Sequence, residues 1–125
     1  MCSVTADPPQ LLVCINCTGR AHEVIRQTGV LCVNLLAGDQ QHVAERFAGR
    51  DKDKFGIGSW KLGIDSVPVL QDALGSLECR VAEVIPASSH SIFLCDVIRS
   101  NIHQNAHEDA LVYLYGGFHS LPVLR

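Results

Sequence analysis

Short apolar runs bounded by turn residues set the hydrophobic pattern of this chain. The run Leu11–Ile15 follows a Pro8-Pro9 pair, and Val30–Leu36 contains β-branched residues and closes at Gly38-Asp39. Apolar runs of this length between turn residues are typical of buried strands. We predict a strand over each run, with a turn at residues 16–20 after the first.

Two other segments carry apolar residues at helical spacing. The first helix is expected to begin at Ala21 and to stop at Gly29, because glycine readily closes a helix. Asp39 is placed to cap a second helix that ends at Gly49. The apolar positions of this second helix recur one turn apart and are Val43, Ala44, Phe47 and Ala48.

The second half of the chain alternates between apolar and polar positions, as strands do. Between residues 77 and 81 the apolar residues alternate with Glu78 and Arg80. The segment Ile92–Ile98 repeats the alternation. We therefore predict that the two segments pair as a long hairpin, with its turn at Pro86–Ser89.

Strands dominate the predicted element order, and Ala110–Tyr115 is expected to be the final one. The charged, glycine-rich segment 50–68 is interpreted as a surface segment whose Phe55 and Trp60 side chains point inward. The chain is thus expected to be mainly β with two or three short helices. An antiparallel barrel fits this order better than a βαβ sheet, and residues 1–125 are expected to form one domain.

Composition and charge narrow the class of protein. Hydrophobic residues make up 47 % and charged residues 18 %, which is typical of a packed globular chain. The net charge of −3 and the scattered Lys and Arg residues, grouped only at 50–54, argue against nucleic acid as a partner. No apolar run approaches the roughly 20 residues of a membrane span. We expect a soluble, cytoplasmic protein that binds no membrane.

The six cysteines do not suggest a disulfide framework. Cys14, Cys32, Cys79 and Cys95 lie in apolar strand-like runs, where a free cysteine behaves as a small hydrophobic residue. This placement favours a reduced intracellular chain.

Metal-binding patterns are weak. Cys14 and Cys17 form a C-x-x-C, which occurs in zinc sites and redox pairs, but no second C-x-x-C accompanies it. A strand-end and a turn cysteine without a joint role is the simpler interpretation, although a zinc site with His22 stays an alternative. His103 and His107 have metal-ligand spacing in a polar loop, where solvation is the better explanation. We predict no metal site.

Three histidines lie at the ends of predicted elements, where barrel proteins often place ligand groups. They are His22, His90 and His119, and both a binding role and a structural role stay open for each. The turn from Asn16 to His22 leads into a helix N-terminus, whose free N–H groups suit an anion such as a phosphate.

The order of these pieces resembles the flavin reductase family over nearly the whole chain. The segments that carry the resemblance are Cys2-Ser3-Val4 to Asp7-Pro8-Pro9, Leu11-Leu12-Val13-Cys14-Ile15-Asn16, His22, Leu31-Cys32-Val33-Asn34-Leu35-Leu36, Arg46-Phe47-Ala48-Gly49, Lys54-Phe55, Trp60, Pro68-Val69-Leu70, Ala73-Leu74, Leu77-Glu78-Cys79, His90-Ser91-Ile92-Phe93, Leu111-Val112-Tyr113, Gly116 and Phe118-His119. Each piece is common, but the combination is specific.

The resemblance implies an FMN-binding split β-barrel that forms a homodimer, with the flavin near the subunit interface. The implied activity is transfer of hydride from NADH or NADPH to free FMN or FAD, which supplies reduced flavin to a partner monooxygenase. The cofactors carry out this chemistry, so no catalytic side chain is expected.

Carried over to this sequence, the resemblance implies four groups of cofactor-binding residues. The flavin would contact Cys2, Ser3, Cys14, Ile15 and Asn16, with His90 near its ring, and its phosphate would lie at the turn that ends in Arg20, Ala21 and His22. Phe47, Ala48 and Gly49 would line the far side of the pocket, while Gly116 and His119 would contact the nicotinamide.

The chain departs from the family pattern at three places. The family's first helix and strands and a Thr-Ala-Thr-Ser-like segment precede the position of Cys2. Gly19, Arg20 and Ala21 replace the usual Ser or Thr of the phosphate turn, and Tyr115 stands where Arg is common. A non-catalytic flavin-binding or remnant domain is therefore the alternative function.

Overall fold

The computed structural model describes residues 1–49, 53–102 and 109–122. The predictions for Arg50, His103 and His107 fall outside these residues. The chain divides into two compact units, which are described one at a time. The first contains Met1–Val33, Leu62–Pro68 and Leu77–Ser100, and the second contains Asn34–Lys61, Val69–Ser76 and Asn101–Arg125. In the described part of the chain, no helix has the length and apolar character needed to cross a membrane.

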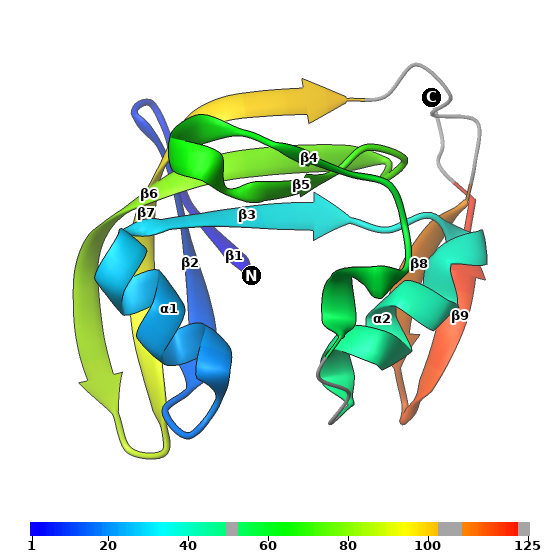
Figure 1. The fold of residues 1–125 in the computed structure, drawn as a ribbon, viewed down its shortest axis with the longest axis horizontal. Helices are drawn as coiled ribbons and strands as arrows, with labels where there is room; N and C mark the ends of the chain where they lie inside the picture. The colour runs from blue at the N-terminus through cyan, green and yellow to red at the C-terminus, as the bar shows by residue number, and fades with distance from the viewer. Residues whose placement is uncertain (50–52, 103–108, 123–125) are drawn as a thin grey trace. The chain divides into compact units, whose positions relative to one another are not determined.

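Strands make up most of the structure, as predicted (Figure 1). The strands are β1 (Cys2–Ala6), β2 (Pro9–Asn16), β3 (Val30–Leu35), β4 (Trp60–Leu62), β5 (Pro68–Leu70), β6 (Gly75–Ala87), β7 (His90–Ile102), β8 (Ala110–Leu114) and β9 (Gly117–Leu121). The helices are α1 (Arg20–Thr28) and α2 (Gln41–Ala48), with 3-10 turns η1 (Gly38–Gln40), η2 (Lys54–Gly56) and η3 (Ile64–Ser66).

A five-stranded sheet in the order β1-β2-β7-β6-β3 forms the framework of the first unit. One face of this sheet packs into a core in which Phe93, Cys79 and Cys95 are fully buried, with Leu11 and Leu31 beside them. The long β6–β7 hairpin is confirmed, and its turn lies at residues 88–89.

Helix α1 covers this core, and its limits follow from its end residues. Ile25 packs against the core cluster. Gly29 adopts a left-handed conformation (φ 73°), and its N–H donates to the Ile25 carbonyl over 2.8 Å, which ends the helix. Gly19 is the N-cap and supplies no side-chain cap. The prediction of a short helix that stops at Gly29 is therefore confirmed.

Glu78 is buried, although it alternates with apolar residues along the strand. Only 1 % of the residue is exposed. Its Oε1 accepts the Ile64 N–H over 2.8 Å and lies 3.7 Å from Arg99 Nη1. A carboxylate can be buried when hydrogen-bond donors and a cation satisfy it. Alternation of residue types does not reveal such partners.

The second unit has its own core, built on α2. Val43, Leu70 and Ala73 are buried, and Phe47 and Trp60 pack against them. The Trp60 Nε1–H donates to the Ile57 carbonyl over 2.7 Å. Phe55 contacts Phe47 and Trp60 but stays 52 % exposed, so the predicted inward position is wrong for Phe55.

Asp39 does not cap α2, contrary to the prediction. The 3-10 turn η1 precedes the helix and places Gln40, rather than Asp39, at its start. The buried Gln40 side chain holds this turn, because its Oε1 accepts the Ala37 N–H over 2.8 Å and its Nε2 donates to the Asp72 carbonyl over 3.0 Å.

The segment predicted as the final strand is followed by another strand. β8 ends at Leu114, and Tyr115 (φ 52°) and Gly116 (φ 75°) form a left-handed two-residue turn into β9. Such turns match the twist of paired strands. His119 consequently pairs with Val112 across the hairpin.

Three buried or half-buried thiols in the first unit should lower the free energy of unfolding at alkaline pH. Burial raises the pKa of Cys79 from its ordinary 9.0 to about 12 and the pKa of Cys32 and Cys95 to about 11. Unfolded thiols ionise first as the pH rises past about 9, so the unfolded state binds fewer protons than the folded state. Stability should therefore fall from about pH 9 through about pH 11–12, as measured by urea midpoints in reducing buffer.

The control for this experiment is Cys2→Ser, because Cys2 is exposed. We expect Cys95→Ala to have a shallower alkaline slope than the parent chain and Cys2→Ser to keep the parent slope. Equal slopes in the two variants would contradict the assignment to buried thiols.

Candidate functional site

The pairing of β2 with β7 sorts the predicted flavin-contacting residues by face. Asn16 lies opposite His90, and Cys14 lies opposite Ile92. Because alternate residues of a strand share a face, Cys14, Asn16 and His90 share one face of the sheet. Cys2 of β1 pairs with Leu12 and belongs to that face too. The structure thus places four of the predicted residues on one surface.

Ile15 faces the other way. It pairs with Ser91 and packs against the core cluster around Phe93. The Ile15 side chain is therefore part of the core, and a contact with flavin would fall to its backbone.

The turn between β2 and α1 is held by a local hydrogen-bond network. Asn16 Oδ1 accepts hydrogen bonds from the N–H and the hydroxyl of Thr18, and both donor–acceptor distances are 2.9 Å. The Gly19 N–H donates to the Asn16 carbonyl, and the Cys17 N–H donates to the Ser89 carbonyl in the β6–β7 turn. Figure 1 shows these two turns side by side. The backbone of the turn is fixed before any ligand arrives.

The start of α1 offers donors for an anion. The amides of Arg20 and Ala21 begin the helix, where backbone N–H groups have no intrahelical partner. Arg20 is exposed, and its guanidinium has no ion-pair partner in the described part of the chain. Two amides and a guanidinium match the chemistry of a phosphate group.

His22 points into the unit rather than only toward solvent. Its Nε2 lies 2.8 Å from the Ser91 hydroxyl, and its ring meets the Phe93 ring edge-on at 5.3 Å. Ser91 is 5 % exposed and also lies 3.6 Å from Cys17 Sγ. Sequence reasoning did not single out Ser91, although its alternation with Phe93 and Cys95 indicates an inward position.

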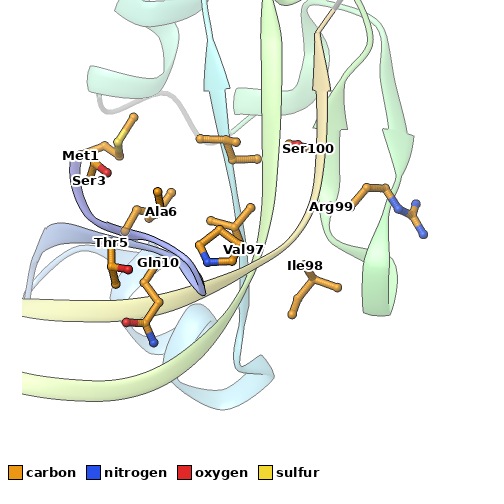
Figure 2. A pocket seen from close by; sticks show the side chains of 12 residues that line it. Met1, Ser3, Thr5, Ala6, Gln10, Val97, Ile98, Arg99 and Ser100 are labelled. Atoms are coloured by element: carbon orange, nitrogen blue, oxygen red, sulfur yellow. The ribbon is translucent and has the colours of Figure 1, made fainter.

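A groove with a volume of ≈ 480 Å³ lies between β1 and the distal half of β7. Figure 2 shows Met1 and Ser3 on one side of it and Val97 and Ser100 on the other. Ser3 lines this groove and Cys2 does not. The two neighbouring residues thus serve different surfaces.

In the second unit, the predicted pocket residues Phe47, Ala48 and Gly49 end α2. The Lys54 ammonium donates to the Phe47 carbonyl over 2.8 Å and thereby stabilises this helix end. The Phe47 ring packs against Trp60. Ala48 and Gly49 are exposed.

Gly116 and His119 lie on the β8–β9 hairpin of the same unit. His119 Nε2 is 3.1 Å from the Leu114 carbonyl, so the ring closes over the turn that Gly116 forms. A separate apolar groove of ≈ 640 Å³ is lined by Tyr113 and Phe118, but not by Gly116 or His119.

The cysteines are all free thiols, so Cys14 and Cys17 are not joined in a disulfide. Cys14 is exposed, contrary to its interpretation as a buried hydrophobic residue, because it lies on the face of β2 away from the core. Within residues 1–49, 53–102 and 109–122, no three His, Cys, Asp or Glu side chains gather as a metal-binding group.

Comparison with known proteins agrees with the resemblance. The family described as "Flavin reductase like domain" matches residues 1–122. The chain is 37 % identical to the FMN reductase (NADH) RutF of Pseudomonas syringae pv. syringae, over 98 % of this chain and 68 % of that protein. It is 38 % identical to the 4-hydroxyphenylacetate 3-monooxygenase reductase component of Pseudomonas aeruginosa, over 100 % of this chain and 75 % of that protein.

Solved structures share the fold. BorF, the flavin reductase component of a bacterial two-component tryptophan halogenase, superposes with a TM-score of 0.86 and 36 % identity, over 98 % of this chain and 78 % of that one. The NADH:FAD oxidoreductase SgcE6 of Streptomyces globisporus, in complex with NAD and FAD fragments, superposes with a TM-score of 0.86 and 27 % identity. The match covers 94 % of this chain and 71 % of that one. The predicted mainly β, split-barrel fold class is confirmed, and the chain belongs to the flavin reductase family.

Proposed function

We propose that this chain catalyses the reduction of free FMN or FAD by NADH or NADPH and supplies reduced flavin to a partner monooxygenase. The observation that carries this proposal is the start of α1, which presents the Arg20 and Ala21 amides beside an exposed Arg20 guanidinium that has no ion-pair partner among the described residues. The names of the relatives support it, since they are FMN reductases that use NADH and a reductase component of a monooxygenase.

The residues of the first unit fit a flavin nucleotide. Arg20 and Ala21 would hold its phosphate, with Gly19 allowing close approach because it has no side chain. Cys2, Cys14, Asn16 and His90 share the surface that would border the ring. Bound flavin and nicotinamide supply the hydride chemistry, so these residues bind and orient and need not donate or accept a proton.

In the second unit, Phe47, Ala48 and Gly49 would line the pocket, and Gly116 and His119 would contact the nicotinamide. The Leu114 carbonyl next to His119 Nε2 supports a fixed ring orientation there. This assignment rests on the family resemblance and on the left-handed turn at Gly116.

We further propose that residues 1–125 act as one flavin reductase-like domain, in a cytoplasmic homodimer. Exposed large apolar side chains support self-association, among them Met1, Val4 and Leu35. Free thiols support a reducing compartment. Light scattering after size exclusion would measure the oligomeric state.

The alternative is a flavin-binding domain without turnover. The start of α1 favours it in one respect, because Gly19 supplies no side-chain cap or hydroxyl donor to a phosphate. Titration of FMN fluorescence detects binding, whereas an NADH oxidation assay detects turnover. Binding without turnover would favour this alternative over the leading proposal.

Purified chain should oxidise NADH or NADPH only when FMN or FAD is added. The flavin is a substrate in this proposal, so the rate should rise with flavin concentration and then saturate. The loss of nicotinamide absorbance measures the rate. The proposed function would be overturned if the rate of nicotinamide oxidation did not depend on added flavin. It would also be overturned if no oxidation occurred with either flavin present.

Arg20→Ala should weaken FMN binding by about tenfold, because it removes a charge-assisted contact to the phosphate. Fluorescence titration measures the dissociation constant. Arg26→Ala is the matched control, since Arg26 lies on the same helix and its nearest acidic partner is Glu23, at 3.7 Å. An equal loss in both variants would indicate general electrostatics rather than a phosphate site.

His119→Ala should raise the KM for NADH by about fivefold while FMN affinity changes little, because only the nicotinamide would lose a contact. Steady-state rates at saturating flavin give the KM. His42→Ala, an exposed histidine of α2, serves as the control. Equal losses of NADH use and FMN binding in His119→Ala would refute the assignment.

A further inference from the structure

We propose that Cys17 is a thiol modification site, activated by Ser91 and His22, and that its oxidation by hydrogen peroxide closes the phosphate turn to flavin. The second half of this proposal rests on the proposed function. The first half rests on the arrangement of three side chains in the first unit.

Ser91 connects the other two groups. Its Oγ lies 2.8 Å from His22 Nε2 and 3.6 Å from Cys17 Sγ. A hydroxyl has one donor and two acceptor positions, so Oγ can accept the His22 N–H and donate its own proton to the sulfur. In that arrangement a Cys17 thiolate receives a hydrogen bond from a hydroxyl that the imidazole polarises.

The surroundings of Cys17 suit a reactive thiolate. Ser91 is buried, so water competes poorly for its hydroxyl, while Cys17 itself is exposed to reagents. Cys17 precedes the first residue of α1 by three positions, and the N-terminus of a helix favours negative charge. The bond from the Cys17 N–H to the Ser89 carbonyl holds the residue in place.

The other thiols lack this combination. Cys2 and Cys14 are exposed, but among the described residues neither sulfur has a hydrogen bond to a side-chain hydroxyl, and the Cys2 thiol donates to the Ser3 carbonyl. Cys79 and Cys95 are buried, and Cys32 is half-buried. The chain thus carries two exposed thiols as internal references for Cys17.

Hydrogen peroxide is the oxidant, and it forms when reduced flavin meets dioxygen. The Cys17 thiolate attacks one peroxide oxygen, an S–O bond forms, the O–O bond breaks, and hydroxide leaves. The sulfur is oxidised to a sulfenic acid and the peroxide is reduced. Cys17 belongs to the turn that leads into α1, three residues before Arg20. The added oxygen would therefore enlarge a side chain of the turn that is proposed to receive the flavin phosphate.

The reactivity of Cys17 is measured without flavin. The folded chain receives a short pulse of iodoacetamide, and mass spectrometry of peptides gives the alkylation rate of each cysteine. We expect Cys17 to react about tenfold faster than Cys2 and Cys14, and Ser91→Ala to remove this difference. Ser91→Thr, which keeps the hydroxyl, should retain most of it.

Ser76→Ala is the matched control, because Ser76 is also buried but its hydroxyl has no partner in the described chain. This variant should leave the Cys17 rate unchanged. A Cys17 rate equal to that of Cys2 and Cys14, or an unchanged rate in Ser91→Ala, would overturn the proposal.

The regulatory half is tested by FMN titration before and after peroxide. The parent chain should lose FMN affinity as Cys17 sulfenic acid appears, and Cys17→Ser should keep its own starting affinity. Unchanged FMN binding by an oxidised parent chain would overturn this half. A parent chain that binds no FMN before peroxide would instead refute the proposed function and leave the alkylation result intact.

Discussion

The register of β2 on β7 decides where every candidate residue of the first unit lies. Asn16 opposite His90 is the last pair of this ladder, and Ile15 opposite Ser91 is the one before it. Because side chains alternate with a period of two, a slip by one residue would turn Ser91 to the outer face and expose the row that contains Phe93. Phe93 and Cys95 are buried, and a slipped register would expose both side chains to water. The free-energy cost of that exposure holds the register.

This register also divides the sheet into a structural face and a binding face. The structural face carries Ile15, Ser91 and Phe93 under α1. The other face carries Cys14, Asn16 and His90, and Cys14 and Asn16 are exposed there. A surface of this kind can border a cofactor without disturbing the core, and a flavin reductase needs orientation more than it needs a strong acid or base.

Sequence periodicity predicted the elements whose ends are set by the residue types found there. The stop of α1 at Gly29 and the β6–β7 hairpin follow from residue type alone. β9 was missed because Tyr115 is an unusual residue for a left-handed turn, so the Tyr-Gly pair did not look like a hairpin loop. The burial of Glu78 was not predicted, because its partners, the Ile64 amide and Arg99, lie 14 and 21 positions away in sequence.

Candidate site residues were predicted by a different route, and the structure changes what two of them can do. The family pattern selects Ile15 and His22 equally with Arg20, yet Ile15 packs in the core and His22 Nε2 is engaged by Ser91. Periodicity alone separates Ile15 from Asn16, because neighbours in a strand face opposite sides. It cannot identify the His22–Ser91 contact, which joins residues 69 positions apart.

The contact between His22 and Ser91 makes the phosphate turn part of the fold. The His22 ring contacts the buried Ser91 hydroxyl and meets the Phe93 ring edge-on, so the packing of the folded chain holds it in place. His22 is the third residue of α1, and fixing its ring fixes the helix start that presents the Arg20 and Ala21 amides. Folding, rather than ligand binding, then orders the turn. Binding of a small anion therefore loses less conformational entropy, which favours tight binding. Because Cys17 Sγ also lies 3.6 Å from the Ser91 hydroxyl, the proposed oxidation of Cys17 would act on the same contact.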